Sequence, residues 1–182
     1  MQFPTPPALR HVFTVAISCV LVSSASLRAD LVDTFLIGEG DSAAEIQFDF
    51  SNGNSYLYLL QWNGDALSGR DVFDVIAQAQ FGYFDFTVQE YEWGEFLTGV
   101  EIGNDIDSGT GSTPPHIDYW HYWTAEASSP WEMSMIGFSD RMLADGARDA
   151  WVFGSDAEPA TIPSPAAGVI LLALRPGRRR GN

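Results

Sequence analysis

Short runs of alternating apolar and polar residues cover most of the stretch 45–153, and this pattern limits the fold more than any other feature. In residues 46–50 the alternation indicates a strand with one buried face. The turn-forming residues 51–54 separate that run from a second one, 56–62, so we predict a β-hairpin. Strands with one apolar face need a second layer of structure to cover it.

One helix is predicted over residues 68–80. Ser68 precedes Asp71 by three positions, which is the spacing of an N-terminal capping box. We expect the helix to end near Gln80, because Gly82 follows. The apolar residues of one helical face are Val72, Phe73, Ile76 and Ala79.

The rest of the pattern adds strands around this helix. They are predicted at residues 84–88, 96–102, 119–124, 131–135 and 150–153. Residues 103–115 are rich in Gly, Ser, Asp and Pro and are predicted to form a loop. We therefore predict an α+β domain over residues 30–154, in which a small, mostly antiparallel sheet packs against one helix. A linker is predicted over 155–162.

Charge is unevenly distributed along the chain. All 24 acidic residues lie between Asp30 and Glu158, a segment with only three basic residues, so its net charge is −21. Such a body repels nucleic acid phosphates and anionic lipid. We expect no nucleic acid partner.

The N-terminal 29 residues have the order of parts of a secretory signal peptide. Arg10 and His11 precede an apolar run, 12–22, and small residues follow at 23–26. A buried N-terminal helix or strand is the alternative. The single cysteine, Cys19, lies in the apolar run, which excludes an internal disulfide and a multi-cysteine metal site. We expect export to the cell envelope or beyond.

The C-terminal residues 163–182 resemble the PEP-CTERM sorting tail of exported bacterial proteins, with a serine in place of the glutamate. The matching residues are the motif Pro163, Ser164 and Pro165 and the basic end Arg178, Arg179 and Arg180. The resemblance implies the secretion machinery and an exosortase as partners. The apolar run between them, 166–174, is shorter than the about twenty residues that cross a bilayer. We expect only a weak membrane association, and an unstructured basic terminus is the alternative.

A second resemblance covers residues 64–153. Residues 71–77 are similar to the helix of the transcobalamin C-terminal-like domain, and 96–100 and 119–123 are similar to two of its strands. Asp145 and Gly146, followed by residues 151–153, resemble its closing hairpin. The resemblance implies a contribution to cobalamin binding, or a bacterial surface protein of unknown role.

An aromatic cluster is the candidate ligand-binding surface. Its members are Tyr119, Trp120, Tyr122 and Trp123. On a strand, Trp120 and Tyr122 face one side, whereas Tyr119, His121 and Trp123 face the other. One side must join the core, and the other is available to stack on a planar ligand or a sugar. Packing alone is the alternative for both sides.

Two short segments have residue types that bind metals. His116, Asp118 and His121 suit zinc, but no fourth ligand is evident. Residues 104–109 alternate oxygen ligands before a glycine, as calcium loops do, but lack the downstream bidentate glutamate. A solvated acidic turn is the preferred explanation of the second segment, so no metal or other cofactor is assigned.

No catalytic motif is present. Glu90, Glu92 and Glu95 are close in sequence, but carboxylates along one strand seldom face each other across a cleft as glycoside hydrolysis needs. The chain has no lysine and no G-x-S-x-G motif. We therefore predict a non-enzymatic exported protein, with an exported binding module for a corrinoid, glycan or other small ligand as the alternative.

Overall fold

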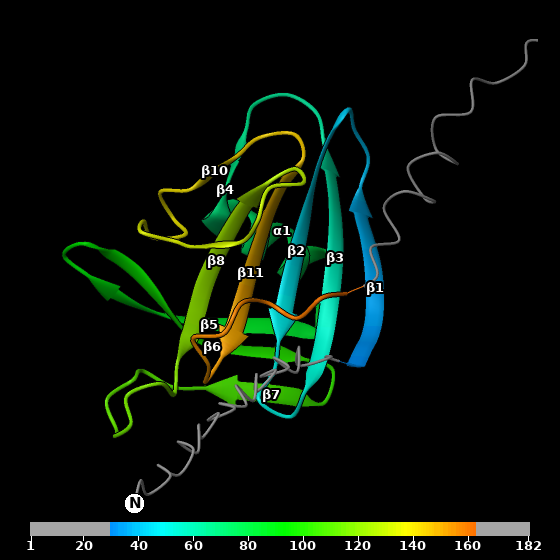
Figure 1. The fold of residues 1–182 in the computed structure, drawn as a ribbon. Coiled ribbons are helices and arrows are strands. Elements are labelled where there is room, and N and C mark those ends of the chain that lie inside the picture. The colour runs from blue at the N-terminus through cyan, green and yellow to red at the C-terminus, as the bar shows by residue number, and fades with distance from the viewer. Residues whose placement is uncertain (1–29, 163–182) are drawn as a thin grey trace, which may run out of the picture.

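Six strands form one mixed sheet, the largest element of the fold (Figure 1). β1 is parallel to β3 and β11 is parallel to β2, whereas the other three pairings are antiparallel. The computed structural model describes residues 30–162, so the predicted signal peptide and sorting tail lie outside the described residues. In spatial order the strands are β1 (Asp30–Gly38), β3 (Asn54–Trp62), β2 (Ser42–Asp49), β11 (Ala147–Phe153), β8 (Trp120–Glu126) and β9 (Glu132–Met133).

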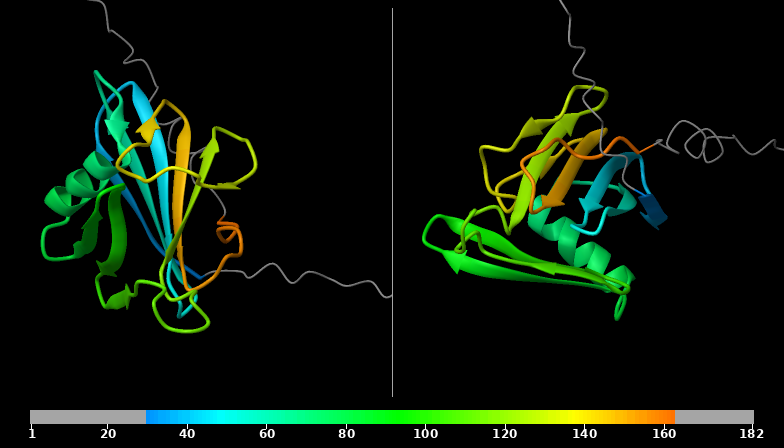
Figure 2. Two further views of the ribbon diagram at one scale, coloured as in Figure 1. Left: turned by 90° about the vertical axis from the view of Figure 1, so that its left-hand side faces the viewer. Right: turned by 60° about the horizontal axis from the view of Figure 1, so that its bottom comes forward.

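A second layer covers one face of this sheet. It consists of the helix α1 (Gly69–Ala79) and a three-stranded antiparallel sheet, as Figure 2 shows. The strands of that sheet are β5 (Phe84–Tyr91), β6 (Gly94–Ile102) and β7 (Asp105–Ser108). A small pairing of β4 (Leu67–Ser68) with β10 (Met142–Leu143) lies beside the start of the helix.

The predicted helix start is confirmed. The Ser68 hydroxyl accepts a hydrogen bond from the Asp71 backbone N–H, and the Asp71 carboxylate accepts one from the Ser68 N–H, which completes the capping box. The buried face is shorter than predicted, since Ala79 is exposed at the last turn. Within residues 30–162, the structure has no helix that is both long and apolar enough to cross a membrane.

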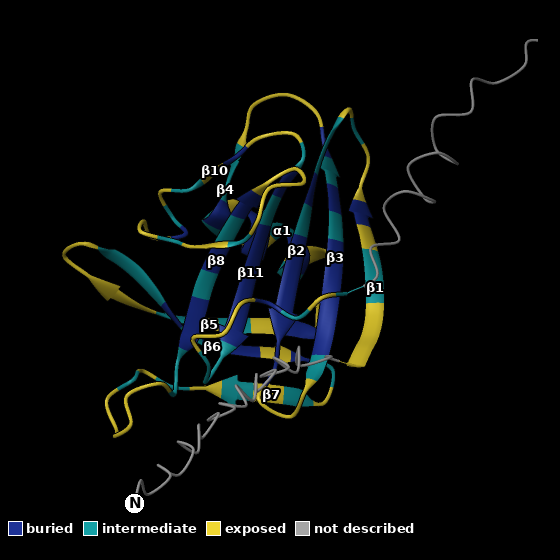
Figure 3. Cartoon of the chain, in the orientation of Figure 1, coloured by how far each residue is buried: buried dark blue, intermediate teal, exposed yellow. Residues whose placement is uncertain are grey.

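Aromatic rings fill the space between the two layers. The ring of Phe48, on β2, meets Phe73 of the helix at 5.5 Å between centroids and Phe84 of the second sheet at 5.6 Å. It also stacks on Trp151 of β11 at 5.5 Å. Figure 3 shows this interior as a continuous buried region across β3, β2, β11 and β8. Burying one such side chain contributes about 1.5–3 kcal/mol.

The expected α+β class is confirmed in its coarse form, as a mostly β domain with one helix in the described part of the chain. Three details differ. Strand β1 was not predicted, and β7 lies in the segment 103–115 that we predicted as a loop, because pairing with β6 fixes it as a strand. Of the predicted strand 131–135, only Glu132–Met133 pairs with β8.

Residues 155–162, which we call the strap, cross the face of the main sheet that lacks the helix layer (Figures 1 and 2). The Ala160 N–H donates a 2.8 Å hydrogen bond to the carboxylate of Asp49. The Gln47 side-chain amide donates to the Ala160 carbonyl at 3.0 Å. The segment expected to be a linker is thus bound to β2 at Ala160.

Candidate ligand-binding groove

A groove of about 340 Å³ opens between β6, β8 and the loop that follows β9. The hairpin of β5 and β6 and the chain after β9 supply its two walls. Its volume is that of a small-molecule site. The lining residues that contribute most of its chemistry are Trp93, Glu95, Phe96, Tyr119, His121, Met135 and Ile136.

Aromatic rings form a continuous series along one wall. At the hairpin tip, Trp93 stacks on Tyr91 with centroids 4.9 Å apart and planes only 7° apart. Phe96 links Tyr91, at 6.5 Å, to Tyr119, at 5.9 Å. Tyr119 then stacks on His121 at 3.9 Å. Trp93 is 64% exposed, so its ring presents a free flat surface to solvent.

The opposite wall, formed by the chain after β9, is apolar and exposed to solvent. Met135 is 95% exposed, and Met133 and Ile136 are about half exposed. The backbone N–H of Ser134 donates a 2.8 Å hydrogen bond to the Tyr122 carbonyl, which ties this segment to β8. Methionine adapts to irregular partners and makes favourable contacts with aromatic rings. A ligand placed here would meet rings on one side and thioethers on the other.

Glu95 and His121 are the two ionisable residues other than tyrosine that line the groove. Glu95 is held by the Arg70 guanidinium at 3.2 Å and by the Ser139 hydroxyl, which donates at 2.7 Å. Burial lowers the pKa of His121, which favours its neutral imidazole. Its Nε2 lies 3.4 Å from the Ile117 carbonyl. The groove therefore offers neutral polar contacts and one carboxylate whose charge is already paired.

Behind the groove lies a buried polar cluster. Tyr122 stacks on Trp151 at 4.5 Å and donates a hydrogen bond to Asp149, which is completely buried. Arg141 reaches the same carboxylate at 3.4 Å. Burial raises the pKa of Asp149 to about 6, although both neighbours lower it. Because Asp149 has no exposed surface, it supports the sheet and has no direct access to the groove.

Comparison with known protein families and with characterised proteins finds no match for this chain. The two resemblances therefore remain hypotheses.

The four predicted ligand-binding residues do not form one surface. Tyr119, Trp120 and Tyr122 line the groove, but Trp120 is almost fully buried and its Nε1–H lies 3.3 Å from the Asp107 carbonyl. Trp123 lies on the opposite face of the main sheet, packed with Val152 and Ala150. The predicted alternation of Trp120 and Tyr122 against Trp123 is confirmed. Tyr119 and Tyr122 both line the groove and are both partly exposed, but the Tyr122 hydroxyl is bonded to the buried Asp149, which leaves Tyr119 as the stronger candidate.

Sequence reasoning missed the other residues of the groove. Trp93 and Phe96 come from the β5–β6 hairpin, and Met135 and Ile136 come from the chain after β9. No sequence spacing links these segments, which meet only in the folded domain. The one available signal was the tryptophan between the two predicted strands 84–88 and 96–102.

The residues weighed for metal binding have other contacts. His116 Nδ1 lies 2.9 Å from the Gly111 carbonyl, and Asp118 accepts a hydrogen bond from the Thr113 hydroxyl. Within residues 30–162, no three His, Cys, Asp or Glu side chains gather closely enough to hold a metal ion.

The acidic segment 104–109 acts as an acceptor for the β2–β3 hairpin. The carboxylate of Asp105 accepts hydrogen bonds from Asn52, Asn54 and Tyr56. Burial raises the pKa of Asp105, but these three bonds outweigh it and the pKa lies below the usual value. Donors from the protein therefore occupy the oxygens that a calcium ion would need.

The three glutamates considered for hydrolysis are not arranged across a cleft. Glu90 and Glu95 are opposite each other in the β5–β6 register, and Glu92 lies in the turn between those strands. Since Glu95 is paired with Arg70, it is not a free acid or base.

Proposed function

We propose that this protein is an exported, non-enzymatic binding protein whose groove takes a ring-shaped ligand of corrinoid or glycan type. The observation that carries the proposal is the series of rings from Trp93 to Tyr119, set opposite the exposed side chains of Met135 and Ile136. Each aromatic stacking contact contributes about 0.5–1.5 kcal/mol beyond the area it buries. Three such contacts contribute about 1.5–4.5 kcal/mol, whereas micromolar binding needs about 8.2 kcal/mol, so burial of the apolar face of the ligand must supply the rest.

The charge of the domain narrows the choice of ligand. Residues 30–158 carry a net charge of −21, and the carboxylate in the groove is paired with Arg70. An anionic ligand would approach against this field, whereas an uncharged or cationic one would not. We therefore propose a neutral or cationic ligand with a flat or ring-shaped apolar face.

The two termini supply the proposed location. Residues 1–29 have the parts of a signal peptide, and residues 163–182 resemble a PEP-CTERM tail. Together they favour a route through the secretion machinery to the cell envelope or the exterior, with an exosortase acting on the tail. Cell fractionation and the mass of the recovered protein test this part. A cytoplasmic product of full mass would overturn it.

Calorimetric titration with cobalamin and with neutral oligosaccharides tests the binding function. We expect one of these ligand classes to bind, and Trp93→Ala to weaken binding at least tenfold, about 1.4 kcal/mol. Phe81→Ala is the matched control, because Phe81 is another highly exposed aromatic residue that does not line the groove. No binding by either class would overturn the binding function while leaving the proposed location untouched.

A further inference from the structure

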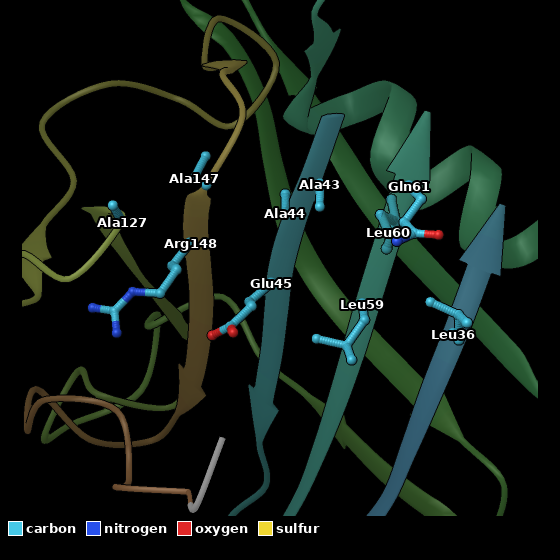
Figure 4. Close-up of a pocket in the computed structure, with 11 residues that line it drawn as sticks. Leu36, Ala43, Ala44, Glu45, Leu59, Leu60, Gln61, Ala127, Ala147 and Arg148 are labelled. Atoms are coloured by element: carbon cyan, nitrogen blue, oxygen red, sulfur yellow. The ribbon is translucent and has the colours of Figure 1, made fainter. Parts of the chain in front are cut away.

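A second groove, of about 220 Å³, lies on the open face of the main sheet (Figure 4). Its apolar surface comes from Leu36 on β1, Leu59 on β3, Ala43 on β2 and Ala127 after β8. Leu36 is 57% exposed. An apolar strip across β1, β3 and β2, left open to water, is a surface that a partner segment stabilises by covering it.

The strap leads directly to this groove. A neighbouring cavity of about 250 Å³ is lined by Thr161 and Ile162, the last described residues, together with Glu45 and Arg148. Glu45 and Arg148 also line the apolar groove. The described chain therefore ends in a cavity that shares two lining residues with the uncovered apolar groove.

We propose that, until an exosortase acts on the tail, the apolar run 166–174 binds in this groove as the continuation of the strap. The run contains nine residues, all apolar or glycine, and it is too short to cross the hydrocarbon core of a bilayer. Left in water, it would expose its side chains at a cost of about 25 cal/mol per Å². The groove provides apolar surface within reach of the same chain.

The dimensions are compatible with this placement. From β11 to β1 the groove spans three inter-strand spacings, or about 14 Å. Residues 163–165 add up to about 10 Å of extended chain after Ile162. Nine further residues cover about 14 Å as a helix and about 30 Å when extended, so the run crosses the groove in either conformation.

Charge favours the same arrangement. Arg175 and the arginines at 178–180 follow the apolar run directly. Glu39 and Asp41 are exposed in the turn between β1 and β2, the strands that carry Leu36 and Ala43. Opposite charges held within about 10 Å of each other attract at physiological salt. We expect the attraction to weaken at high salt, whereas the apolar contact persists.

Cysteine cross-linking of the full chain tests the proposal. In a Cys19→Ser background, Leu59→Cys is combined with Leu172→Cys under mild oxidation, with Leu36→Cys as a second groove position. The matched control pairs Leu172→Cys with Phe81→Cys, since Phe81 is 94% exposed and lies after the helix, on the other side of the sheet. Non-reducing gels and mass spectrometry report the products.

We expect intramolecular disulfides with both groove positions, forming at least tenfold faster than in the control. Equal rates in the groove and control pairs would overturn the proposal. Disulfides between two chains would overturn it as well and would assign the groove to a second copy. Because Leu36 is exposed, Leu36→Cys keeps the test valid if Leu59→Cys disturbs the sheet. Neither result depends on whether the first groove, lined by Trp93 and Tyr119, binds a ligand.

Discussion

The hydroxyl of Tyr122, on β8, donates a 2.5 Å hydrogen bond to the carboxylate of Asp149, on β11, in the interior of the domain. Arg141 contacts the same carboxylate and also pairs with Glu126 at 2.6 Å. Even with these partners, burial keeps the pKa of Asp149 near 6. One carboxyl in the core thus makes the stability of the whole sheet sensitive to pH.

Asp149→Asn should remove a pH-dependent part of the stability. The folded protein holds the Asp149 proton up to about pH 6, whereas an unfolded chain releases it near its ordinary pKa of about 3.9. Between these values the folded state binds more protons, so its stability falls as pH rises. We expect the free energy of unfolding of the variant, relative to the original protein, to increase by roughly 2 kcal/mol from pH 4 to pH 7.

Urea unfolding of both proteins across that pH range measures this difference directly. Contributions from the other acidic residues cancel in the comparison. A difference that stays constant with pH, or that decreases, would contradict the assignment of the raised pKa to Asp149.

Tyr122→Phe should destabilise the domain more at pH 7.5 than at pH 4.5. The variant keeps the ring that stacks on Trp151 but removes the donor to Asp149. Leaving a buried ionised group without that donor costs about 1–3 kcal/mol. At pH 4.5 the carboxyl of Asp149 is protonated in the folded state, and most of this cost disappears. Chemical unfolding at the two pH values checks the expectation, which fails if the loss is equal at both.

Gly69→Ala should lower stability, although alanine favours helices by about 1 kcal/mol. A Cβ at Gly69 would meet the backbone carbonyl of Phe138, closer than real Cβ atoms approach their neighbours. The Gly69 N–H also donates a 2.8 Å hydrogen bond to the Arg141 carbonyl, so the helix start cannot move away freely. We expect a loss of about 1–3 kcal/mol in thermal or urea unfolding.

The control for this substitution is Gly137→Ala. A Cβ at Gly137 meets no atom within 4 Å, so the Gly137→Ala variant should be about as stable as the original protein. If the two variants were equally stable, the close packing of the helix start against Phe138 would be refuted.

Asp49→Ala should release the strap from the sheet. The buried carboxylate accepts hydrogen bonds from Gln47, Ser55 and the Ala160 N–H, and all three donors would lose their acceptor. We expect a destabilisation of about 1–3 kcal/mol and faster cleavage by proteinase K within residues 155–162. Asp65→Ala, at an exposed position, is the control. Unchanged cleavage kinetics would show that Asp49 does not hold the strap.

Local patterns in the chain predicted the local elements correctly. The two strands of the hairpin, the turn between them and the capping box at Ser68 each depend on neighbouring residues, and each appears in the structure. The single buried face predicted for 46–50 is wrong, because Gln47 and Asp49 are buried as well, where they bond to Ala160 of the strap. The pairing of residues 84–88 with 96–102 is local for the same reason and is also confirmed. Sequence reasoning works where the partners of a residue lie within about one turn or hairpin.

Elements defined by distant partners could not be predicted in this way. Strand β1 has no regular alternation, and its partner is the parallel strand β3, which a second strand separates from it along the chain. Strand β7 has the composition of a loop, and only its ladder with β6 makes it a strand. The groove at Trp93 could not be predicted for the same reason, because Trp93 and Met135 come from segments that meet only after folding.

Strand β11 occupies the middle of the main sheet, between β2 and β8, although it is the last strand of the described chain. Its parallel pairing joins residue 147 to residue 44. A chain that has emerged only as far as β10 therefore contains two separate pieces of sheet, with no central strand to connect them. Contacts between such distant residues make folding slow. Whichever compartment the protein folds in, the edges of β2 and β8 stay unpaired until β11 is available, and unpaired strand edges are prone to aggregate.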